Sequence, residues 1–254
     1  MAWPRLMDLT ADYAYCRLHG SREPYRSRYE LAAFDLWAKR AKTWVTEHAM
    51  TDGAFIGAPN ALNQYTSVGA VSPTYDANGN PTFDGTFTFG YDAENRLVSA
   101  SGAGTSANYA YDALGRRKAK TVNGATTVFV QDPQSRALLD YAGASGTVLN
   151  WYAFGSGPND VLARMNAAGT ALTTFIPDIL GSVVGRLGAG DGILTKAGFQ
   201  TFGESTSTAG TFLYTGARID AEIGGLYDFR ARMYSPRLGR FMQPDPVGME
   251  DLTA

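Results

Sequence analysis

The sequence has very little of the chemistry on which most enzymes depend. It contains one cysteine (Cys16) and two histidines (His19 and His48), and all three lie within residues 1–50 of the 254. Residues 51–254 therefore offer no histidine base, no thiol nucleophile and neither of the side chains that most often bind zinc. We expect no catalytic residues, no metal and no cofactor in this chain.

Other absences narrow the class of protein further. The single cysteine excludes an internal disulfide, and no apolar run reaches the ~18 residues of a membrane-spanning helix. The net charge is −2, which gives no basic footprint for nucleic acid. Residues 1–8 lack the basic start and apolar core of a signal peptide. We therefore expect no membrane span and no nucleic-acid partner.

Composition changes near residue 50. Three of the four tryptophans lie in residues 1–50, whereas 28 of the 29 glycines lie in residues 51–254. The second region is therefore much richer in glycine than the usual ~7%. The sequence predicts five segments: an N-terminal fragment (1–50), a linker (51–72), a repeat region (73–215), a terminal motif (216–248) and a truncated tail (249–254).

The N-terminal fragment predicts a short α+β unit. Residues 13–18 are typical of a buried strand, and apolar residues recur at helical spacing over residues 29–45. One strand and one amphipathic helix cannot enclose a core, so we expect a piece of a larger fold. Arg17, His19 and Arg22 are a candidate anion site, but isolated motif residues lack the converging partners that a site needs.

A tandem motif opens the repeat region. Each copy has a tyrosine that ends a strand, an aspartate that opens a turn by accepting backbone N–H groups, and a residue that tolerates positive φ. Successive tyrosines are 16 and 20 residues apart, which is enough for one hairpin per copy. The nine residues are Tyr75, Asp76, Gly79, Tyr91, Asp92, Asn95, Tyr111, Asp112 and Gly115.

The residues of these copies also fit two other functions. Asp76, Asp92 and Asp112 are candidate calcium ligands, but each turn supplies one reliable carboxylate, whereas calcium takes about six to eight oxygens. The tyrosine-rich strands are candidate contacts for carbohydrate or a protein partner. We expect the aspartates to be structural turn residues.

Short apolar segments follow the copies at regular intervals. Glycine-rich turns separate them, which predicts an all-β array. The expected strands cover residues 125–130, 137–141, 148–154, 161–165, 171–176, 183–187 and 193–202.

The terminal motif predicts a strand, a turn and a short return. Aromatic residues and arginines alternate from Leu226 to Tyr234, as in a strand with one apolar and one charged face. Residues 235–239 have the composition of a turn. Four arginines lie within residues 230–240.

The arginines of the motif need carboxylate partners. We expect Arg230, Arg232 and Arg240 to pair with acidic residues of the same segment, with the alternative that they position Asp245. The acidic residues in question are Asp220, Glu222 and Asp228.

The tyrosine–aspartate copies resemble YD repeats of the RHS family, and the terminal motif resembles the RHS repeat-associated core. This resemblance covers about residues 72–248. It implies a mainly β fold of antiparallel YD-repeat hairpins that form part of an RHS-type β shell. The matching core residues are Gly225, Leu226, Tyr227, Arg230, Arg232, Tyr234, Pro236, Gly239, Arg240, Phe241, Asp245, Pro246 and Gly248.

The segment from about residue 11 to residue 50 resembles a fragment of a DUF72 family protein, a TIM-barrel-like group of uncertain activity. The RHS resemblance implies a shell around a C-terminal polymorphic toxin, with aspartyl self-cleavage after the core, for which Asp245 is the matching residue. The sequence ends at Ala254, before the expected second carboxylate and cleavage junction. We therefore expect no autoproteolysis.

Taken together, the residues and the resemblance predict a non-catalytic structural fragment of an RHS shell. Its expected partners are the remainder of the shell and a toxin cargo, with self-association through open sheet edges. The family implies a secreted or cell-surface location. The alternatives are a cell-surface module that binds carbohydrate or protein, and the remnant of a DUF72-like barrel enzyme.

Overall fold

The computed structural model describes residues 7–10, 13–16, 60, 62, 64–157, 159–189, 192–200, 202–205 and 210–245. The chain divides into two compact units. Residues 1–73 with 238–240 form one unit, and residues 74–237 with 241–254 form the other.

In the first unit, β1 (Met7–Thr10) and β2 (Tyr13–Cys16) form an antiparallel hairpin with Met7 opposite Cys16. A strand was predicted at 13–18, and the hairpin adds the partner that the sequence had not indicated. The predicted helix at 29–45 lies outside the described residues. So do the candidate anion-site residues Arg17, His19 and Arg22.

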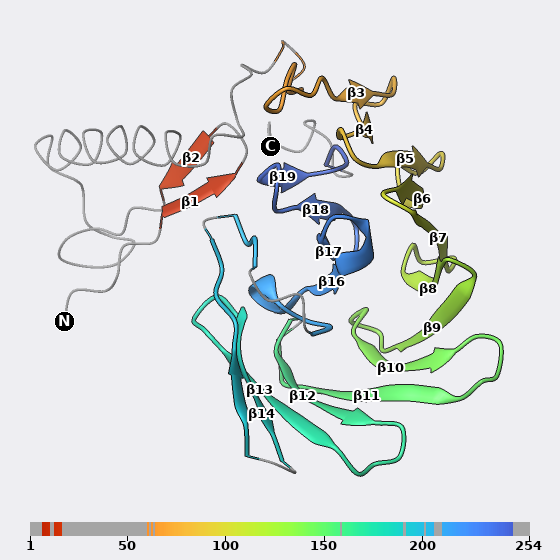
Figure 1. Ribbon diagram of the computed structural model, residues 1–254, viewed down its shortest axis with the longest axis vertical. Helices are drawn as coiled ribbons and strands as arrows, with labels where there is room; N and C mark the ends of the chain where they lie inside the picture. Colours follow the sequence, from red (N-terminus) through yellow and green to blue (C-terminus); the bar gives the residue numbers. More distant parts are fainter. Residues whose placement is uncertain are drawn as a thin grey trace, which may run out of the picture. The chain divides into compact units, whose positions relative to one another are not determined.

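In the second unit, one antiparallel sheet contains thirteen strands, and their order in the sheet follows their order in the chain. Figure 1 shows the sheet curling from β3 to β14. The strands are β3 (Thr74–Tyr75), β4 (Pro81–Phe83), β5 (Thr88–Tyr91), β6 (Leu97–Gly102), β7 (Thr105–Tyr111), β8 (Arg117–Val122), β9 (Ala125–Gln131), β10 (Ala137–Ala142), β11 (Val148–Phe154), β12 (Val161–Asn166), β13 (Leu172–Pro177), β14 (Val183–Gly188) and β15 (Leu194–Lys196).

Period-two patterning and tight turns explain this sheet. In β7, Ala107 and Tyr109 are buried while the residues beside them are exposed, so one face packs and the other meets solvent. Asn123 and Gly124 join β8 to β9, with φ values of 48° and 86°. Positive φ at both positions is the geometry of a two-residue hairpin turn whose twist matches its strands.

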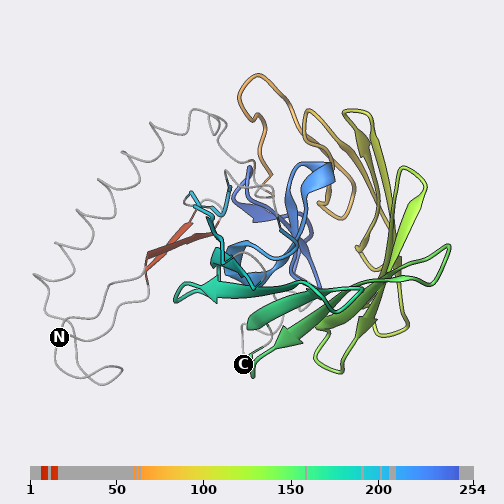
Figure 2. The ribbon, with the colours of Figure 1, turned by 60° about the horizontal axis from the view of Figure 1, so that its bottom comes forward.

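The C-terminal segment, residues 210–237, lies inside the curve of the large sheet, as both ribbon views show (Figures 1 and 2). A four-stranded sheet is formed from this segment and the residues that follow it. Its elements are η1 (Tyr214–Gly216), β16 (Arg218–Asp220), η2 (Ala221–Ile223), β17 (Leu226–Asp228), β18 (Met233–Ser235) and β19 (Arg240–Phe241).

Two groups of buried apolar residues hold the C-terminal segment in place. Phe212 packs edge-on against Tyr152 of β11, with ring centroids 5.1 Å apart, and also contacts Phe175 of β13. Tyr227 and Tyr234 form the second group within the segment itself. The first group therefore joins the large sheet to the segment through residues far apart in the sequence, and the second group forms the interior of the segment.

The predicted strand over 226–234 is wrong in one respect, because the structure divides it into β17 and β18. Asp228 Oδ1 accepts the backbone N–H of Arg230 at 2.8 Å, and Arg230 has a φ of 67°. This aspartate turn interrupts the period-two pattern. The strand predicted at 193–202 is likewise shorter, since only β15 is regular there.

No helix in the described part of the chain has the length and apolar character to cross a membrane.

Candidate functional site

The repeat turns are built around one aspartate each. In the second copy, Asp92 Oδ1 accepts the N–H groups of Glu94 and Arg96 at 3.0 and 2.9 Å, and Asp92 Oδ2 accepts Arg96 Nε at 2.8 Å. Asn95 supplies the left-handed residue, with φ of 59°. The structure places Asp76 and Asp112 at the start of equivalent turns, with Gly79 and Gly115 at the positive-φ position.

Sequence reasoning missed two further copies. Asp132 makes the same bonds to Gln134 and Arg136, with Ser135 at φ of 62°. Asp178 accepts two N–H groups in the same way. The signal for the Asp132 copy was present, because an aspartate with an arginine four residues later recurs 20 residues after Asp112. The missing tyrosine and glycine concealed it.

The tyrosine position ties each turn to the strand before it. Tyr91 donates its hydroxyl to the Pro81 carbonyl at 3.0 Å, and Tyr111 donates to the Leu97 carbonyl at 2.7 Å. In the copy without tyrosine, Gln131 Nε2 donates to the Arg117 carbonyl at 2.9 Å. Glutamine therefore preserves the hydrogen bond that the tyrosine makes elsewhere.

In two copies, the arginine four residues after the aspartate links its turn to a later one. Arg116 donates to the Asp132 carbonyl at 3.2 Å, and Arg136 donates to the Gly155 carbonyl at 2.7 Å. The repeat aspartates are thus occupied within their own turns. Among the described residues, no group of three or more His, Cys, Asp or Glu is placed to hold a metal ion.

Replacing Asp92 with alanine is expected to destabilise the second unit by about 1–2 kcal/mol. The change removes the acceptor of two backbone N–H groups and of Arg96, and such capping bonds typically contribute this much. Urea unfolding followed by circular dichroism measures it. Glu94→Ala, in the same turn at a side chain that is 70% exposed, is the matched control and should have little effect. Equal losses in both variants would contradict a specific role for Asp92.

A buried ionic cluster joins β8 to the C-terminal segment. Arg117 contacts Asp220 at 2.5 Å and Asp228 at 2.9 Å, and Lys120 contacts Asp220 at 2.8 Å and Glu222 at 2.5 Å. The Asp220 side chain has 0% exposure. A buried charge is tolerated only when it is paired, so these contacts fix where β16 and β17 lie on the sheet.

A second charged contact lies next to the first. Arg218 of β16 donates to Asp140 of β10 at 3.2 Å, and Tyr152 donates its hydroxyl to the same carboxylate oxygen at 2.8 Å. The Arg218 guanidinium also lies 4.7 Å from the centre of the Phe129 ring and 5.0 Å from that of Phe212. Aromatic faces stabilise such a cation where water is excluded.

The electrostatics of the cluster follow from burial and pairing. Burial alone raises the pKa of Asp220, but Arg117 and Lys120 outweigh it, and the pKa lies below its ordinary value. Burial opposes the charge of Arg117, but Asp220 and Asp228 raise its pKa. Burial also raises the pKa of Tyr109, with the negative charge of Asp220 adding to the effect. The shifts of Asp220 and Arg117 keep their ion pair charged at neutral pH, and the shift of Tyr109 keeps its hydroxyl protonated.

Acid should therefore loosen the C-terminal segment. Because the folded-state pKa of Asp220 is depressed, its contribution is fully present above the unfolded value of ~3.9 and is lost as pH falls through the folded pKa. We expect the free energy of unfolding to decrease below about pH 4, and to decrease less steeply in Asp220→Asn. Urea unfolding at several pH values measures both slopes, and parallel slopes would contradict the assignment.

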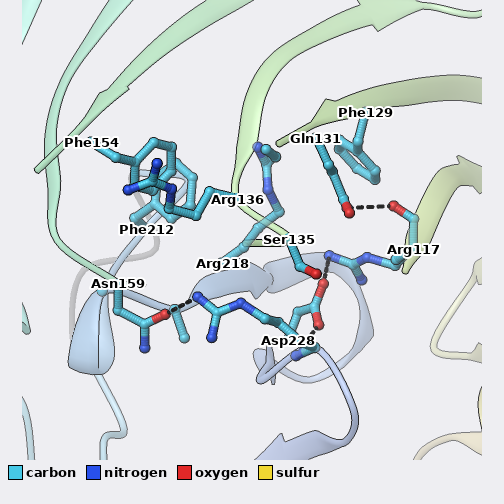
Figure 3. Close-up of a pocket in the computed structure, with 14 residues that line it drawn as sticks. Arg117, Phe129, Gln131, Ser135, Arg136, Phe154, Asn159, Phe212, Arg218 and Asp228 are labelled. Carbon is cyan, nitrogen blue, oxygen red and sulfur yellow. Dashed lines mark hydrogen bonds and ion pairs between the residues drawn. The ribbon is translucent and has the colours of Figure 1, made fainter. Parts of the chain in front are cut away.

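A small cavity lies between the sheet and the C-terminal segment (Figure 3). Its volume is about 40 Å³, and it is partly enclosed. Figure 3 shows Arg136 beside Phe154 and Phe212, and Ser135 next to Asp228 and Arg117. The lining residues are Arg117, Phe129, Gln131, Ser135, Arg136, Ala137, Phe154, Asn159, Phe212, Gly216, Ala217, Arg218, Asp228 and Arg230.

Comparison with protein families identifies the repeat. Residues 91–128 match the family described as RHS Repeat. The chain therefore carries an RHS repeat. Residues 1–64 match the family described as Protein of unknown function DUF72, a longer match than the segment from which the resemblance was inferred.

Curated relatives share the RHS region. The tRNA nuclease WapA of Bacillus subtilis (strain 168) is 32% identical over 206 residues, and the tRNA3(Ser)-specific nuclease WapA of Bacillus spizizenii is 32% identical over 197 residues. Each alignment covers 74% of this chain and 8% of the relative. Salivary gland surface protein 1 of Aedes aegypti is 42% identical over 48 residues, 19% of this chain and 1% of that protein. This chain thus spans about 8% of the length of the WapA relatives that it matches.

Solved structures show the same fold. The crystal structure of TcdB2-TccC3 superposes with a TM-score of 0.54 at 20% identity, covering 70% of this chain and 10% of that chain. A Photorhabdus luminescens Tc holotoxin pore gives a TM-score of 0.50 at 17% identity over the same shares. The described sheet therefore has the RHS-type β-shell fold, as predicted from the YD repeats.

The apolar residues of the RHS core motif are buried. Leu226 and Tyr227 lie in β17, where the Tyr227 hydroxyl donates to the Gly203 carbonyl at 2.9 Å. Gly225 precedes them with φ of 73°. Tyr234 donates to the Phe202 carbonyl at 3.1 Å. These side chains form the interior of the C-terminal segment.

The acidic residues that we expected to pair with the arginines of the core motif make ion pairs with β8. Asp220 and Asp228 pair with Arg117, and Lys120 contacts Asp220 and Glu222, so the cations come from β8. The sequence-based assignment failed because Asp228 ends β17 and breaks the predicted alternation. The observed contacts of the motif are Arg230 with Asn159 at 2.6 Å, Arg232 with Asp245 at 3.1 Å, and Arg240 over the Tyr65 ring at 4.7 Å.

The last motif residues surround a turn and Asp245. Pro236 and Gly239 lie in the turn between β18 and β19, and Phe241 packs edge-on against Tyr234, with ring centroids 5.5 Å apart. Asp245 is 55% exposed and pairs with Arg232, which is the alternative that the sequence left open. Pro246 and Gly248 lie outside the described residues.

Proposed function

We propose that this chain is a non-catalytic wall segment of an RHS shell that encloses or presents a C-terminal toxin. The observation that carries the proposal is a thirteen-stranded sheet, in sequence order, curled around the C-terminal segment of the same chain. A wall built from consecutive hairpins gains length by adding repeats, because each strand pairs only with its neighbours. The ion pairs of Arg117 and Lys120 then attach the inner segment to that wall.

Two comparisons support the proposal that the enclosed cargo is a toxin domain. The WapA relatives are named as tRNA nucleases, and this chain aligns with about 8% of each. The structural neighbours belong to Tc toxin assemblies. A toxin domain carried by a longer protein is therefore the proposed cargo, with the remainder of the shell as the proposed partner.

The edge strands provide the means of extension. Within the described residues, β3 and β15 each have a neighbour on one side only. Ala197 N–H bonds to the Val184 carbonyl and Gly188 N–H to the Ile193 carbonyl, so the N–H groups of Leu194 and Lys196 point away from β14. These outward N–H groups are free to pair with a further strand.

Self-association tests this edge directly. We expect concentration-dependent oligomers of the full chain in sedimentation velocity, reduced by Lys196→Pro, which removes one outward N–H without breaking a bond to β14. Lys196→Gln removes the charge but keeps the N–H, and it should behave as the parent chain does. Monomers in all three proteins at every concentration would contradict an extendable wall.

The alternative of a carbohydrate-binding module is tested separately. Tyr91 and Tyr111 already donate their hydroxyls to backbone carbonyls of the sheet, which makes them wall components in this proposal. Specific binding on a glycan array would favour the alternative.

A further inference from the structure

The cavity of Figure 3 has an unusual lining. Four of its lining residues are arginines, namely Arg117, Arg136, Arg218 and Arg230, whereas Asp228 is its one acidic residue. The volume of about 40 Å³ exceeds the ~10–15 Å³ that one water requires. The space therefore suits a small polar group surrounded by guanidinium groups.

Two of the carboxylates that balance these arginines do not line the cavity. Arg136 pairs with Asp132, and Arg218 pairs with Asp140. Neither aspartate is a lining residue. Asp228, the one acidic lining residue, pairs with Arg117 at 2.9 Å, so Arg136 and Arg218 are the lining arginines whose carboxylate partners lie outside the lining.

Some of the donors are unused within the protein. Arg218 Nη2 and Arg117 Nε are buried, and no protein acceptor among the described residues bonds to either atom. The Arg117 side chain is almost fully buried, with 2% exposure. A buried N–H group without an acceptor is costly, so an acceptor in the cavity would be strongly favoured.

The aromatic lining of the cavity strengthens the attraction between the arginines and a bound anion. Phe129, Phe154 and Phe212 form the apolar part of the lining. They lower the local dielectric, which increases the interaction between a guanidinium and an anion. Burial also lowers the pKa of Arg230, as expected for a cation removed from water.

We propose that this cavity binds the oxyanion group of a ligand, a phosphate or a carboxylate, through Arg218 and Arg230. Arg218 lines the cavity and has an unused Nη2, and Arg230 lines the cavity from the turn between β17 and β18. A charged acceptor bound by two guanidiniums makes short, charge-assisted hydrogen bonds. The site is independent of the proposed wall function, because it requires no second chain and no cargo.

Isothermal titration calorimetry of the full chain tests the proposal, with inorganic phosphate and acetate titrated separately at constant ionic strength. We expect saturable binding of at least one anion, and the tighter of the two identifies the chemical source. Arg218→Gln should weaken binding at least about tenfold, the loss expected for one charge-assisted contact. Arg237→Gln removes an arginine that does not line the cavity and should leave the affinity unchanged.

Arg230→Gln shows whether a loss of anion binding is a direct effect or a result of unfolding. It leaves the ion pairs of Arg117 and Arg218 intact, and it should also weaken binding. A direct heat of binding is required because phosphate stabilises folded proteins generally by exclusion from their surfaces. The absence of saturable heat with either anion, or equal affinities in the parent chain and both cavity variants, would overturn the proposal.

Discussion

Replacing Asp220 with alanine should destabilise the second unit by about 3–5 kcal/mol, among the largest losses for any single charge in the chain. The change leaves Arg117 fully buried with one carboxylate partner in place of two, and leaves Lys120 with Glu222. Removing one member of a buried ion pair typically has this cost, because an uncompensated charge remains in the interior. Urea unfolding followed by circular dichroism measures the loss.

Two further variants test whether the loss in Asp220→Ala comes from the unpaired buried charge or from lost packing. Asp220→Leu combined with Arg117→Met replaces the pair with apolar side chains and should recover much of the loss, since buried ion pairs are often replaceable in this way. Glu94→Gln alters an exposed ion pair and should change the stability little. A small effect of Asp220→Ala, comparable to that of Glu94→Gln, would show that the cluster does not anchor the C-terminal segment.

Tyr227→Ala is the second change with a large expected effect, again about 3–5 kcal/mol. The Tyr227 side chain is fully buried, with 0% exposure, and its ring lies 5.9 Å from that of Tyr214. Truncation removes the ring and leaves a cavity in the interior of the C-terminal segment. The Gly203 carbonyl also loses its donor. Thermal and urea unfolding measure the effect.

Two control variants identify the cause of the stability loss in Tyr227→Ala. Tyr227→Phe keeps the ring and removes the hydroxyl, so it should cost about 1–2 kcal/mol. Trp151→Ala truncates a larger ring that is 50% exposed on β11, and it should cost much less than Tyr227→Ala. A loss from Trp151→Ala as large as that from Tyr227→Ala would contradict the assignment of the core.

Local pattern was sufficient to predict most of the large sheet. Strands were expected at 125–130, 137–141 and 148–154, and the structure has Ala125–Gln131, Ala137–Ala142 and Val148–Phe154. The agreement has a physical cause, because each strand pairs with the next one along the chain. Turn residues and period-two alternation therefore contain most of the information that the sheet needs.

Long-range contacts were not predictable in the same way. Arg117 and Lys120 meet Asp220 across separations of 103 and 100 residues, and nothing local to either segment indicates the partner. The Asp132 turn was missed for the opposite reason. Its local signal was present, but Gln131 and Ser135 occupy the positions where tyrosine and glycine were sought.

Hydrogen–deuterium exchange of the full chain, read by mass spectrometry, tests most directly whether the wall and its C-terminal segment form one cooperative unit. We predict that peptides from β16 and β17 are protected as strongly as those from β8, and that Asp220→Ala accelerates exchange in all three strands together. Protected β8 beside rapidly exchanging β16 and β17 in the unaltered chain would contradict this account.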